Sequence, residues 1–271
     1  MTHDLTDTTF IIPVRIESED RLRNVITSVC FLLENFDTRI IIKEFDRQSV
    51  FLSHALPQIS EYLEGKEKNI NHVFEQSDDP HFYRQMFINQ MLDMVETEVV
   101  GNYDSDVLLP IDSIIESQRM IVEDEADVVY PYGWGTYQEK IPPSDQLVSE
   151  FLSNDCDFSV FEGKTTPDRA ESGHVQFIRT SSYREAGMEN ENFVAYAPED
   201  KERLHRFKTL GYRVGRLEKK VYHLEHARTP NSWINNPHMN NNLQLWDFLQ
   251  SLNEEELRQY YKEQKYLKKY Q

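Results

Sequence analysis

The 271-residue sequence has only two cysteines, Cys30 in an apolar helical stretch and Cys156 in an acidic loop. Two cysteines in such different surroundings count against a disulfide framework and against a cysteine-based metal site. No apolar run approaches the roughly 18 residues that a membrane-spanning helix needs. The amino terminus, MTHDLTDTT, is acidic and polar where a signal peptide would be basic and then apolar. We therefore expect a cytoplasmic protein without a transmembrane segment.

Basic residues are also scarce, with 29 Lys and Arg against 47 Asp and Glu and a formal net charge of -18. This balance counts against nucleic acid as a partner, because binding it means neutralising phosphates with Lys and Arg. A small phosphorylated ligand stays possible if a divalent cation accompanies it. The hydrophobic content of 39% is that of a folded globular protein. The length allows one sizeable core or at most two small domains.

The first half of the chain alternates between apolar, strand-like runs and helical periodicity. Strands are predicted at 9–14, 39–45, 71–74 and 98–103, and helices at 18–33, 52–63 and 81–95. This alternation predicts an α/β protein with a largely parallel sheet covered by helices on both faces. In such sheets ligands bind beyond the carboxyl ends of the strands. We expect Arg15, Glu44 and the acidic cluster 104–106 to meet there.

The second half is less regular. Helices are predicted at 111–121, 182–188 and 199–210, strands at 126–130, 175–179 and 216–223, and a loop rich in Gly and aromatic residues at 132–137. After Ala227 the composition shifts to Asn and Pro, and a charged helix is predicted from Asn253.

The acidic motif Asp104-Ser105-Asp106 directly follows the strand predicted at 98–103. One carboxylate of such a pair can ligate Mn²⁺ or Mg²⁺, and the other can reach a ribose or the water shell of the cation. The cation then bridges the two phosphates of a nucleotide. An isolated match of this kind is more often a solvated turn, so the motif needs support from other residues.

Two further motifs supply that support. His223 and His226 end the strand-like run VYHLEH, and beside an acidic motif they predict a mixed oxygen and nitrogen site that suits Mn²⁺ better than Ca²⁺. Glu199 and Asp200 open a predicted helix. They are either ordinary first-turn charges that favour the helix dipole or a general base for an attacking hydroxyl.

In their order along the chain these motifs resemble those of the GT-A-fold glycosyltransferases, specifically family 2 enzymes whose C-terminal half is similar to that of the β-1,4-galactosyltransferases. The resemblance covers roughly residues 8–228 and rests on five matches. These are Ile12-Pro13-Val14-Arg15; Phe82-Tyr83-Arg84 with Asn89; Asp104-Ser105-Asp106; the segment from Gly173 through Gly187-Met188 to Glu199-Asp200; and His223-Leu224-Glu225-His226.

The resemblance implies a GT-A (Rossmann-like) fold with a central, mostly parallel sheet flanked by helices. It implies a catalytic domain at 1–228, divided into a nucleotide-sugar half (1–107) and an acceptor half (108–228), and a C-terminal helical extension at 229–271. The implied activity is metal-dependent, inverting transfer of a hexose or N-acetylhexosamine, galactose-type favoured, in polysaccharide or glycan biosynthesis. The donor would be a UDP-sugar and the acceptor a saccharide or lipid-linked saccharide.

The resemblance also implies roles for individual residues. Asp106, His226 and His223 would hold Mn²⁺ or Mg²⁺, Asp200 would be the base, and Glu199 would be its neighbour at the sugar or acceptor. The nucleotide sugar would be bound by Pro13, Val14, Arg15, Glu44, Arg84, Asn89, Asp104, Ser105 and Asp106. The acceptor would meet Gly173 and Tyr196. Trp134 and Tyr132 either stack on a sugar ring, since aromatic faces suit apolar C–H faces, or belong to a packed glycine turn. The galactosyltransferases have Trp-Gly-Gly-Glu-Asp where this chain has AYAPED at 195–200, which leaves the identity of the acceptor open.

Other functions fit the sequence less well. A phosphohydrolase would carry its nucleophilic Asp after the first strand, where this chain has Pro13-Val14-Arg15. A sugar-nucleotide pyrophosphorylase would need a Gly-rich phosphate loop in the first strand-to-helix turn, and that turn has no Gly. A non-catalytic protein that binds sugar nucleotides or saccharides on the same fold stays open.

The C-terminal residues 254–271 predict one more helix, acidic at its start and basic at its end. Leu257, Tyr260, Tyr261 and Leu267 fall on one face, and Tyr266 and Tyr270 fall on another beside four lysines. Two roles are open. The helix is either an arm packed on its own domain or on a second copy, or a weak peripheral contact with an anionic membrane surface.

Overall fold

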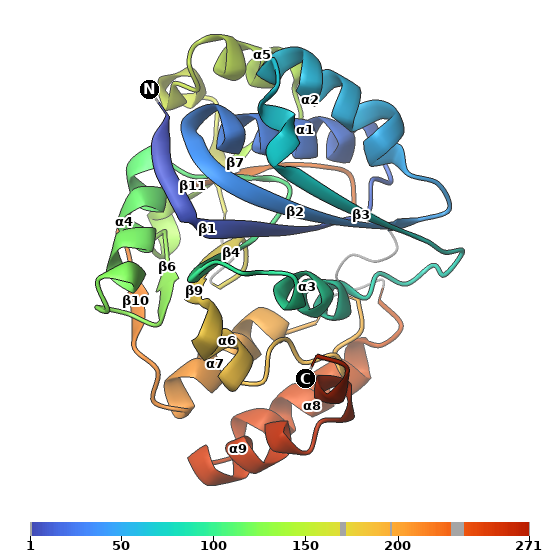
Figure 1. The fold of residues 1–271 in the computed structure, drawn as a ribbon, viewed down its shortest axis with the longest axis vertical. Helices are drawn as coiled ribbons and strands as arrows, with labels where there is room; N and C mark the ends of the chain where they lie inside the picture. The colour runs from blue at the N-terminus through green and yellow to red at the C-terminus, as the bar shows by residue number, and fades with distance from the viewer. Residues whose placement is uncertain (1, 169–171, 196, 229–235, 271) are drawn as a thin grey trace.

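The computed structural model describes residues 2–168, 172–195, 197–228 and 236–270, and its centre is a seven-stranded sheet (Figure 1). The strands lie in the order β10-β6-β9-β4-β1-β2-β3. Their bounds are β10 Val214–Arg216, β6 Val128–Tyr130, β9 Val175–Arg179, β4 Val99–Tyr103, β1 His3–Val14, β2 Phe36–Asp46 and β3 Ile70–Gln76. Every neighbouring pair is parallel except the two that include β9. The predicted mostly parallel α/β sheet is confirmed.

Helices flank this sheet (Figure 1). On one side lie α1 (Glu19–Asn35), α2 (Leu56–Leu63) and α5 (Asp145–Ser153), and on the other lie α3 (Arg84–Asp93), α6 (Thr180–Glu185) and α7 (Glu199–Thr209), while α4 (Ile111–Val122) packs against β6 and β9. Short helical turns are η1 (Phe51–Ala55), η2 (Lys66–Asn69), η3 (Gly135–Tyr137), η4 (Phe158–Phe161) and η6 (Lys265–Lys269). Ser18 caps the amino terminus of α1, because its Oγ accepts the Arg21 N–H at 3.3 Å.

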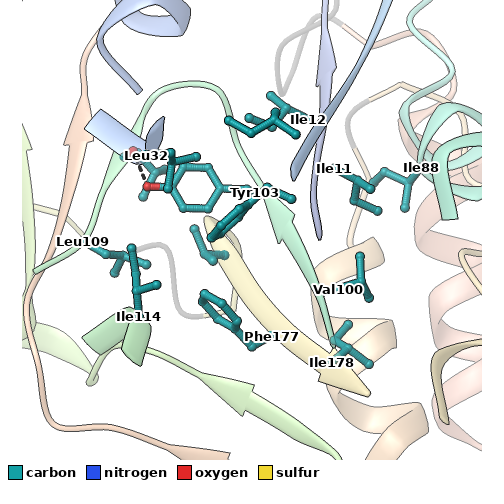
Figure 2. Packing of buried hydrophobic residues seen from close by; sticks show 14 of the residues in the cluster. Ile11, Ile12, Leu32, Ile88, Val100, Tyr103, Leu109, Ile114, Phe177 and Ile178 are labelled. Atoms are coloured by element: carbon teal, nitrogen blue, oxygen red, sulfur yellow. Dashed lines mark hydrogen bonds between the residues drawn. The ribbon is translucent and has the colours of Figure 1, made fainter. Parts of the chain in front are cut away.

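The core fills the space between the sheet and its helices. Figure 2 shows Ile11 of β1, Tyr103 of β4 and Phe177 of β9 among apolar side chains from α1, α3 and α4. The Tyr103 hydroxyl donates to the Val107 carbonyl at 2.8 Å, which satisfies the one polar atom that this ring brings into the core. This hydrogen bond joins the residue before the acidic motif to the residue after it, and so fixes the turn that carries Asp104 and Asp106.

The predicted strand at 216–223 is wrong, because the chain divides there between two sheets. β10 ends at Arg216 in the large sheet, and β11 (Val221–Leu224) belongs to a second sheet with the order β5-β11-β7-β8. The other strands of that sheet, which we did not predict, are β5 (Val107–Leu108), β7 (Gln138–Ile141) and β8 (Thr166–Pro167). In the antiparallel register of β11 and β5, His223 pairs with Val107, and the Leu224 N–H donates to the Asp106 carbonyl at 2.8 Å. This register brings the histidine motif to the acidic motif.

The C-terminal extension forms two helices, α8 (Met239–Gln250) and α9 (Glu254–Lys262). Figure 1 shows both next to α6 and α7, on the side of the sheet away from α1 and α2. Leu249, Leu257 and Tyr261 are buried and join the main hydrophobic core. No helix in the described part of the chain is long and apolar enough to cross a membrane. The domain boundary at 228/229 borders a segment outside the described residues and stays a prediction.

Candidate active site

A cleft of about 250 Å³ opens at the carboxyl ends of β1 and β4. Its lining is strongly charged: four arginines, five carboxylates and three histidines. They are Arg15, Arg21, Arg84, Arg228, Glu17, Asp104, Asp106, Glu199, Asp200, His174, His223 and His226, and Pro13, Phe82, Ser105 and Ala195 complete the lining. The four arginines are outnumbered by the five carboxylates, so a phosphorylated ligand would need a divalent cation as well as the arginines to balance its charge.

Three side chains of the cleft could hold a metal ion together. One ligand atom each from Asp106, His223 and His226 lies within 4.8 Å of the other two. The Asp106 Oδ2 is 3.2 Å from His226 Nε2 and 3.7 Å from His223 Nε2. One carboxylate and two imidazoles form a donor set that suits Mn²⁺. The metal-ligand prediction is consistent with this placement and stays a prediction.

The Nδ1 atoms of His223 and His226, on the side of each ring away from Asp106, also have hydrogen-bond partners. His226 Nδ1 lies 2.8 Å from the Ala227 carbonyl, and His223 Nδ1 lies 3.2 Å from Glu225 Oε1. Both of these oxygens are acceptors, so each Nδ1 carries the proton and each Nε2 is directed to Asp106. Metal-binding histidines are commonly oriented in this way by a second partner.

The charges of the cluster compensate one another. Burial opposes the ionised form of Asp106, but His223 and His226 outweigh it and hold the pKa of this carboxyl well below its ordinary value. Burial likewise opposes the charged form of His223, yet Asp106 and Glu225 raise its pKa to about 10. A divalent cation bound here would take the place of the proton on His223 Nε2.

Arg84 at the start of α3 connects the acidic motif to the second carboxylate pair. Its Nη2 donates to Asp104 Oδ1 at 2.5 Å, and its Nη1 lies 3.8 Å from Glu199 Oε1. Asp104 and the predicted catalytic pair therefore share one guanidinium.

Glu199 and Asp200 open α7 at the floor of the cleft. Burial, and then the charge of Asp200, raises the pKa of Glu199 well above its ordinary value, although Arg84 opposes this shift. Burial also raises the pKa of Asp200, against the opposing effects of Arg203 and Arg84. A carboxylate with a raised pKa is the better proton acceptor near neutral pH, which suits a general base.

The loop before β9 forms the wall beside Asp200. A β-carbon at Gly173 would lie 3.1 Å from Asp200 Oδ2, so glycine keeps this wall open. His174 follows with φ of 66°, a left-handed conformation that is uncommon for residues other than glycine, and its carbonyl accepts the Asp104 N–H at 3.0 Å. Gly173 therefore lies beside Asp200 without lining the cleft itself, and its predicted contact with an acceptor stays a prediction.

Two predicted nucleotide contacts lie elsewhere. Glu44 is fully buried and accepts the N–H groups of Val50 and Phe51 at 2.8 and 2.9 Å, so its carboxylate caps the start of η1. Asn89 is also buried, and its side chain exchanges hydrogen bonds with the backbone of Glu189 at 2.7 and 2.9 Å. Both predictions are corrected, because the side chains are already bound inside the protein.

Of the other predicted ligand-binding residues, some are buried in the core and others are accessible to a ligand. Val14 packs into the core while its neighbour Pro13 lines the cleft. Tyr132 is fully buried and its hydroxyl donates to the Gly173 carbonyl, so its ring cannot stack on a sugar. Trp134 is 47% exposed, with the Arg216 guanidinium 3.9 Å from its ring centre. Tyr196 lies outside the described residues.

Several lining residues were not predicted. Arg21 lies in the first turn of α1, which starts just after β1, so its place at the same edge follows from the βα connection. His174 directly follows the predicted Gly173, and its side chain lines the cleft although no role was predicted for it. Arg228 lies two residues beyond His226, and Ala195 lies four before Glu199. Glu17, two residues beyond the predicted Arg15, completes this set, and Phe82, to which no role was assigned, lines the cleft as a member of the Phe82-Tyr83-Arg84 motif.

No protein-family profile matches the chain, and neither does any curated protein sequence. Solved structures do. TarS (residues 1–349) of S. aureus in complex with UDP-GlcNAc has a TM-score of 0.57 at 13% identity, over 92% of this chain and 69% of that one. A mannosyltransferase from Pyrobaculum calidifontis in complex with GDP-Man and Mn²⁺ has a TM-score of 0.52 at 12% identity, over 82% of this chain. The chain has a GT-A-like fold.

At these identities the likeness concerns the fold alone. The chain spans 57% of the length of the mannosyltransferase. The catalytic domain of a Drosophila β-1,4-galactosyltransferase 7 has a TM-score of 0.43 at 14% identity, over 83% of this chain and 72% of that one, and is too distant to support an argument. The closer resemblance to the β-1,4-galactosyltransferases therefore stays a prediction.

Proposed function

We propose that this protein is a metal-dependent, inverting glycosyltransferase that moves a hexose or N-acetylhexosamine from a UDP-sugar to a saccharide hydroxyl. The observation that carries the proposal is the joint presence, in one cleft, of the Asp106, His223 and His226 cluster and the Glu199–Asp200 pair. Metal ligands and a general base are the two groups that such a transfer needs. The GT-A-like fold supports the same reading.

The donor end of the cleft has the chemistry of a diphosphate site. Asp106, His223 and His226 would hold Mn²⁺ or Mg²⁺, and the bound cation would neutralise charge that develops on the departing diphosphate. Arg15 is fixed by donating from Nη1 to the Asp79 and Pro80 carbonyls at 3.1 and 3.0 Å. Its guanidinium is thereby placed in the lining, where it can face phosphate oxygens.

The carboxylate pair would handle the acceptor. Asp200 takes the proton of the attacking hydroxyl as that oxygen bonds to the anomeric carbon and the carbon–oxygen bond to the diphosphate breaks. The hydroxyl attacks the face opposite the leaving group, which inverts the configuration. Glu199 is more deeply buried and carries the more strongly raised pKa, so it is suited to hold a proton and to donate it to a sugar hydroxyl.

The side of the cleft at Gly173 and Ala195 is the expected entry for the acceptor, since Asp200 lies there. Trp134 offers an exposed ring on the same half of the chain, and aromatic faces suit the apolar C–H faces of sugars. A neighbour that binds UDP-GlcNAc favours a UDP donor, whereas one that binds GDP-Man requires GDP-sugars to be tested as well. Galactose remains the favoured sugar on the sequence resemblance alone.

The proposal is tested by incubating the protein and Mn²⁺ with a panel of UDP- and GDP-sugars and mono- and disaccharide acceptors, followed by ¹H NMR. We expect one UDP-sugar to be consumed and a product of opposite anomeric configuration to form. A product of retained configuration would refute the inverting mechanism. Tight binding of sugar nucleotides without any turnover, in the presence of every acceptor class, would favour the non-catalytic binding protein.

A further inference from the structure

A buried ion pair lies directly behind the proposed base. Arg203, four residues into α7, is fully buried, and its Nε and Nη2 donate to the two carboxylate oxygens of Glu189 at 2.6 and 3.0 Å. Its Nη1 donates to Gln176 Oε1 at 2.6 Å and to Asp200 Oδ1 at 3.1 Å. One rigid guanidinium therefore joins the core to the carboxylate that we assign as the base.

The two oxygens of Asp200 have different surroundings. Oδ1 accepts the hydrogen bond from Arg203, and Oδ2 faces the bare α-carbon of Gly173. The side chain of Asp200 is 29% exposed, so the carboxylate is open to the cleft while its orientation is set from behind.

A second buried pair repeats this arrangement one turn further along α7. The Arg206 Nε donates to Glu202 Oε1 at 3.0 Å, and both side chains are almost completely buried. The Arg206 Nη1 also donates to the Ala186 and Met188 carbonyls at 2.7 and 2.6 Å. Arg203 and Arg206 of α7 thus both form hydrogen bonds to the segment 186–189, Arg206 to the carbonyls of Ala186 and Met188 and Arg203 to the side chain of Glu189.

The C-terminal extension packs against these two buried ion pairs, which we call the α7 framework (Arg203–Glu189 and Arg206–Glu202). The hydroxyl of Tyr261 in α9 donates to Glu202 Oε1, and the ring centre of Tyr261 lies 4.5 Å from the Arg206 guanidinium. The ring fits against Gly187, where φ is 95° and a β-carbon would lie 2.3 Å from Tyr261 Cδ1. Any side chain at position 187 would exclude the ring. The surface on which α9 packs is therefore formed by α7 and by the segment 186–189 together.

We propose that Arg203 is a positioning residue for Asp200, and that α9, through Tyr261, is part of the framework that holds Arg203 and the first turn of α7 in place. This inference rests on the proposed function, because it assigns Asp200 as the base. Buried ion pairs are on average poor sources of stability compared with apolar side chains of the same size. A pair of them behind a reacting carboxylate is better explained by the geometry that they impose.

The charges around Asp200 give the inference a signature beyond structure. The charged groups that interact with Asp200 are Arg203 and Glu199 on α7, Arg84 on α3, Asp104 after β4, and Glu189. The phenols of Tyr130 in β6 and Tyr132 just after it are the titratable groups on the sheet side. Burial raises the pKa of Asp200, and Arg203 is the first of the groups that oppose this rise. A variant that removes or moves this guanidinium should therefore shift the acidic limb of the kcat profile to higher pH.

The test compares Arg203→Lys with Arg179→Lys, a matched control at the far end of β9, where Arg179 pairs with Glu98 and Asp124. We expect Arg203→Lys to lower kcat by about 10- to 100-fold, because a small misplacement of a reacting group has effects of that size. Its KM for the sugar nucleotide should stay near the wild-type value, and its acidic limb should move up in pH. Equal kcat and an equal pH profile in the two variants would overturn the assignment of Arg203.

Tyr261→Phe tests the part of α9, and also serves if Arg203→Lys does not fold. This change keeps the ring over Arg206 and removes only the hydroxyl that reaches Glu202. We expect faster amide hydrogen exchange in the first turns of α7 and a smaller loss of kcat in the same direction, with donor binding retained. Unchanged exchange together with an unchanged pH profile would overturn the role of α9. A wild-type protein that turns over no sugar nucleotide would instead refute the proposed function, and the exchange measurement would still decide whether α9 holds α7.

Discussion

Single residues decide which carboxylate of the cleft takes the proton. Both carboxyls have a raised pKa, but the side chain of Asp200 is 29% exposed and that of Glu199 only 8%. Asp200→Asn keeps the shape of the side chain and removes the proton acceptor. We expect kcat to fall by about 10²–10⁴-fold, the usual contribution of general-base catalysis, with little change in the affinity for UDP.

Steady-state kinetics and calorimetry with UDP check this prediction. Glu199→Gln is the matched variant, since it makes the same chemical change one residue earlier. An Asp200→Asn variant with normal kcat beside an inactive Glu199→Gln variant would move the role of base to Glu199.

Glu199 also makes a prediction about stability. Burial and then Asp200 raise its pKa well above 4.5 in the folded protein, so the folded state binds this proton more tightly than the unfolded state does. The ionised side chain therefore opposes folding, and its contribution to stability falls as the pH rises above 4.5. Glu199→Gln should match the wild type near pH 4 and should melt about 2–4 °C higher at pH 8, which is about 1 kcal/mol for a domain of this size.

Thermal denaturation at several pH values measures the difference, and the exposed Glu162→Gln provides the control. A Glu199→Gln variant whose melting temperature differs from that of the wild type by the same amount at pH 4 and pH 8 would contradict the raised pKa.

The residues that the sequence predicted well are those whose position along the chain already fixes their place in space. Asp104 and Asp106 follow the apolar strand β4 at once, so the edge of the sheet delivers them to the cleft. Glu44 was misjudged because a strand directs alternate side chains to opposite faces, and the composition of β2 does not say which face meets the ligand. Its carboxylate turns to the N–H groups of η1 instead.

Among the elements, the regular first half was predictable and the second sheet was not. β7 has the sequence QEKI, which shows little of the apolar alternation of a strand, and it forms by pairing with β11 and β8. α8 contains three consecutive asparagines, which are poor helix formers, and its helix depends on packing against α7. Long-range pairing of this kind leaves no local trace in a sequence.

At the level of the C-terminal helix, the packing arm now has stronger support than the membrane contact. Tyr266 is buried, and the Tyr270 hydroxyl donates to Glu191 at 2.7 Å, so neither ring is free to enter a membrane interface. Only exposed lysines remain, each worth about 1 kcal/mol at an anionic surface. We expect a variant with Lys262, Lys265 and Lys268 changed to Gln to sediment with anionic liposomes at low salt to the same extent as the wild type.

A variant with Lys68, Lys164 and Lys208 changed to Gln controls for the loss of three positive charges elsewhere. Sedimentation of the wild type and of this control, but not of the C-terminal variant, would restore the membrane hypothesis.

The molecule as a whole gathers four arginines, five carboxylates and three histidines in one cleft of a strongly acidic chain. The GT-A-like sheet brings β1, β4 and the loop before β9 to one edge, and the second sheet adds His223 of β11, with His226 just after that strand. The sequence could predict the first of these arrangements from its βα alternation. For the second, the motifs predicted that His223 would meet Asp106, but not the pairing of two short strands far apart in the chain, β5 and β11, that brings them together.

The central claim is that Asp106 and the two histidines make sugar transfer depend on a divalent cation. Release of nucleoside diphosphate from the preferred sugar nucleotide, measured with millimolar Mn²⁺ and again with EDTA, tests it most directly. We predict full activity of the wild type with Mn²⁺, loss of activity in EDTA, and no measurable activity in folded Asp106→Ala or His226→Ala, with the exposed His54→Ala as an active control. Undiminished release by Asp106→Ala in EDTA would contradict the account.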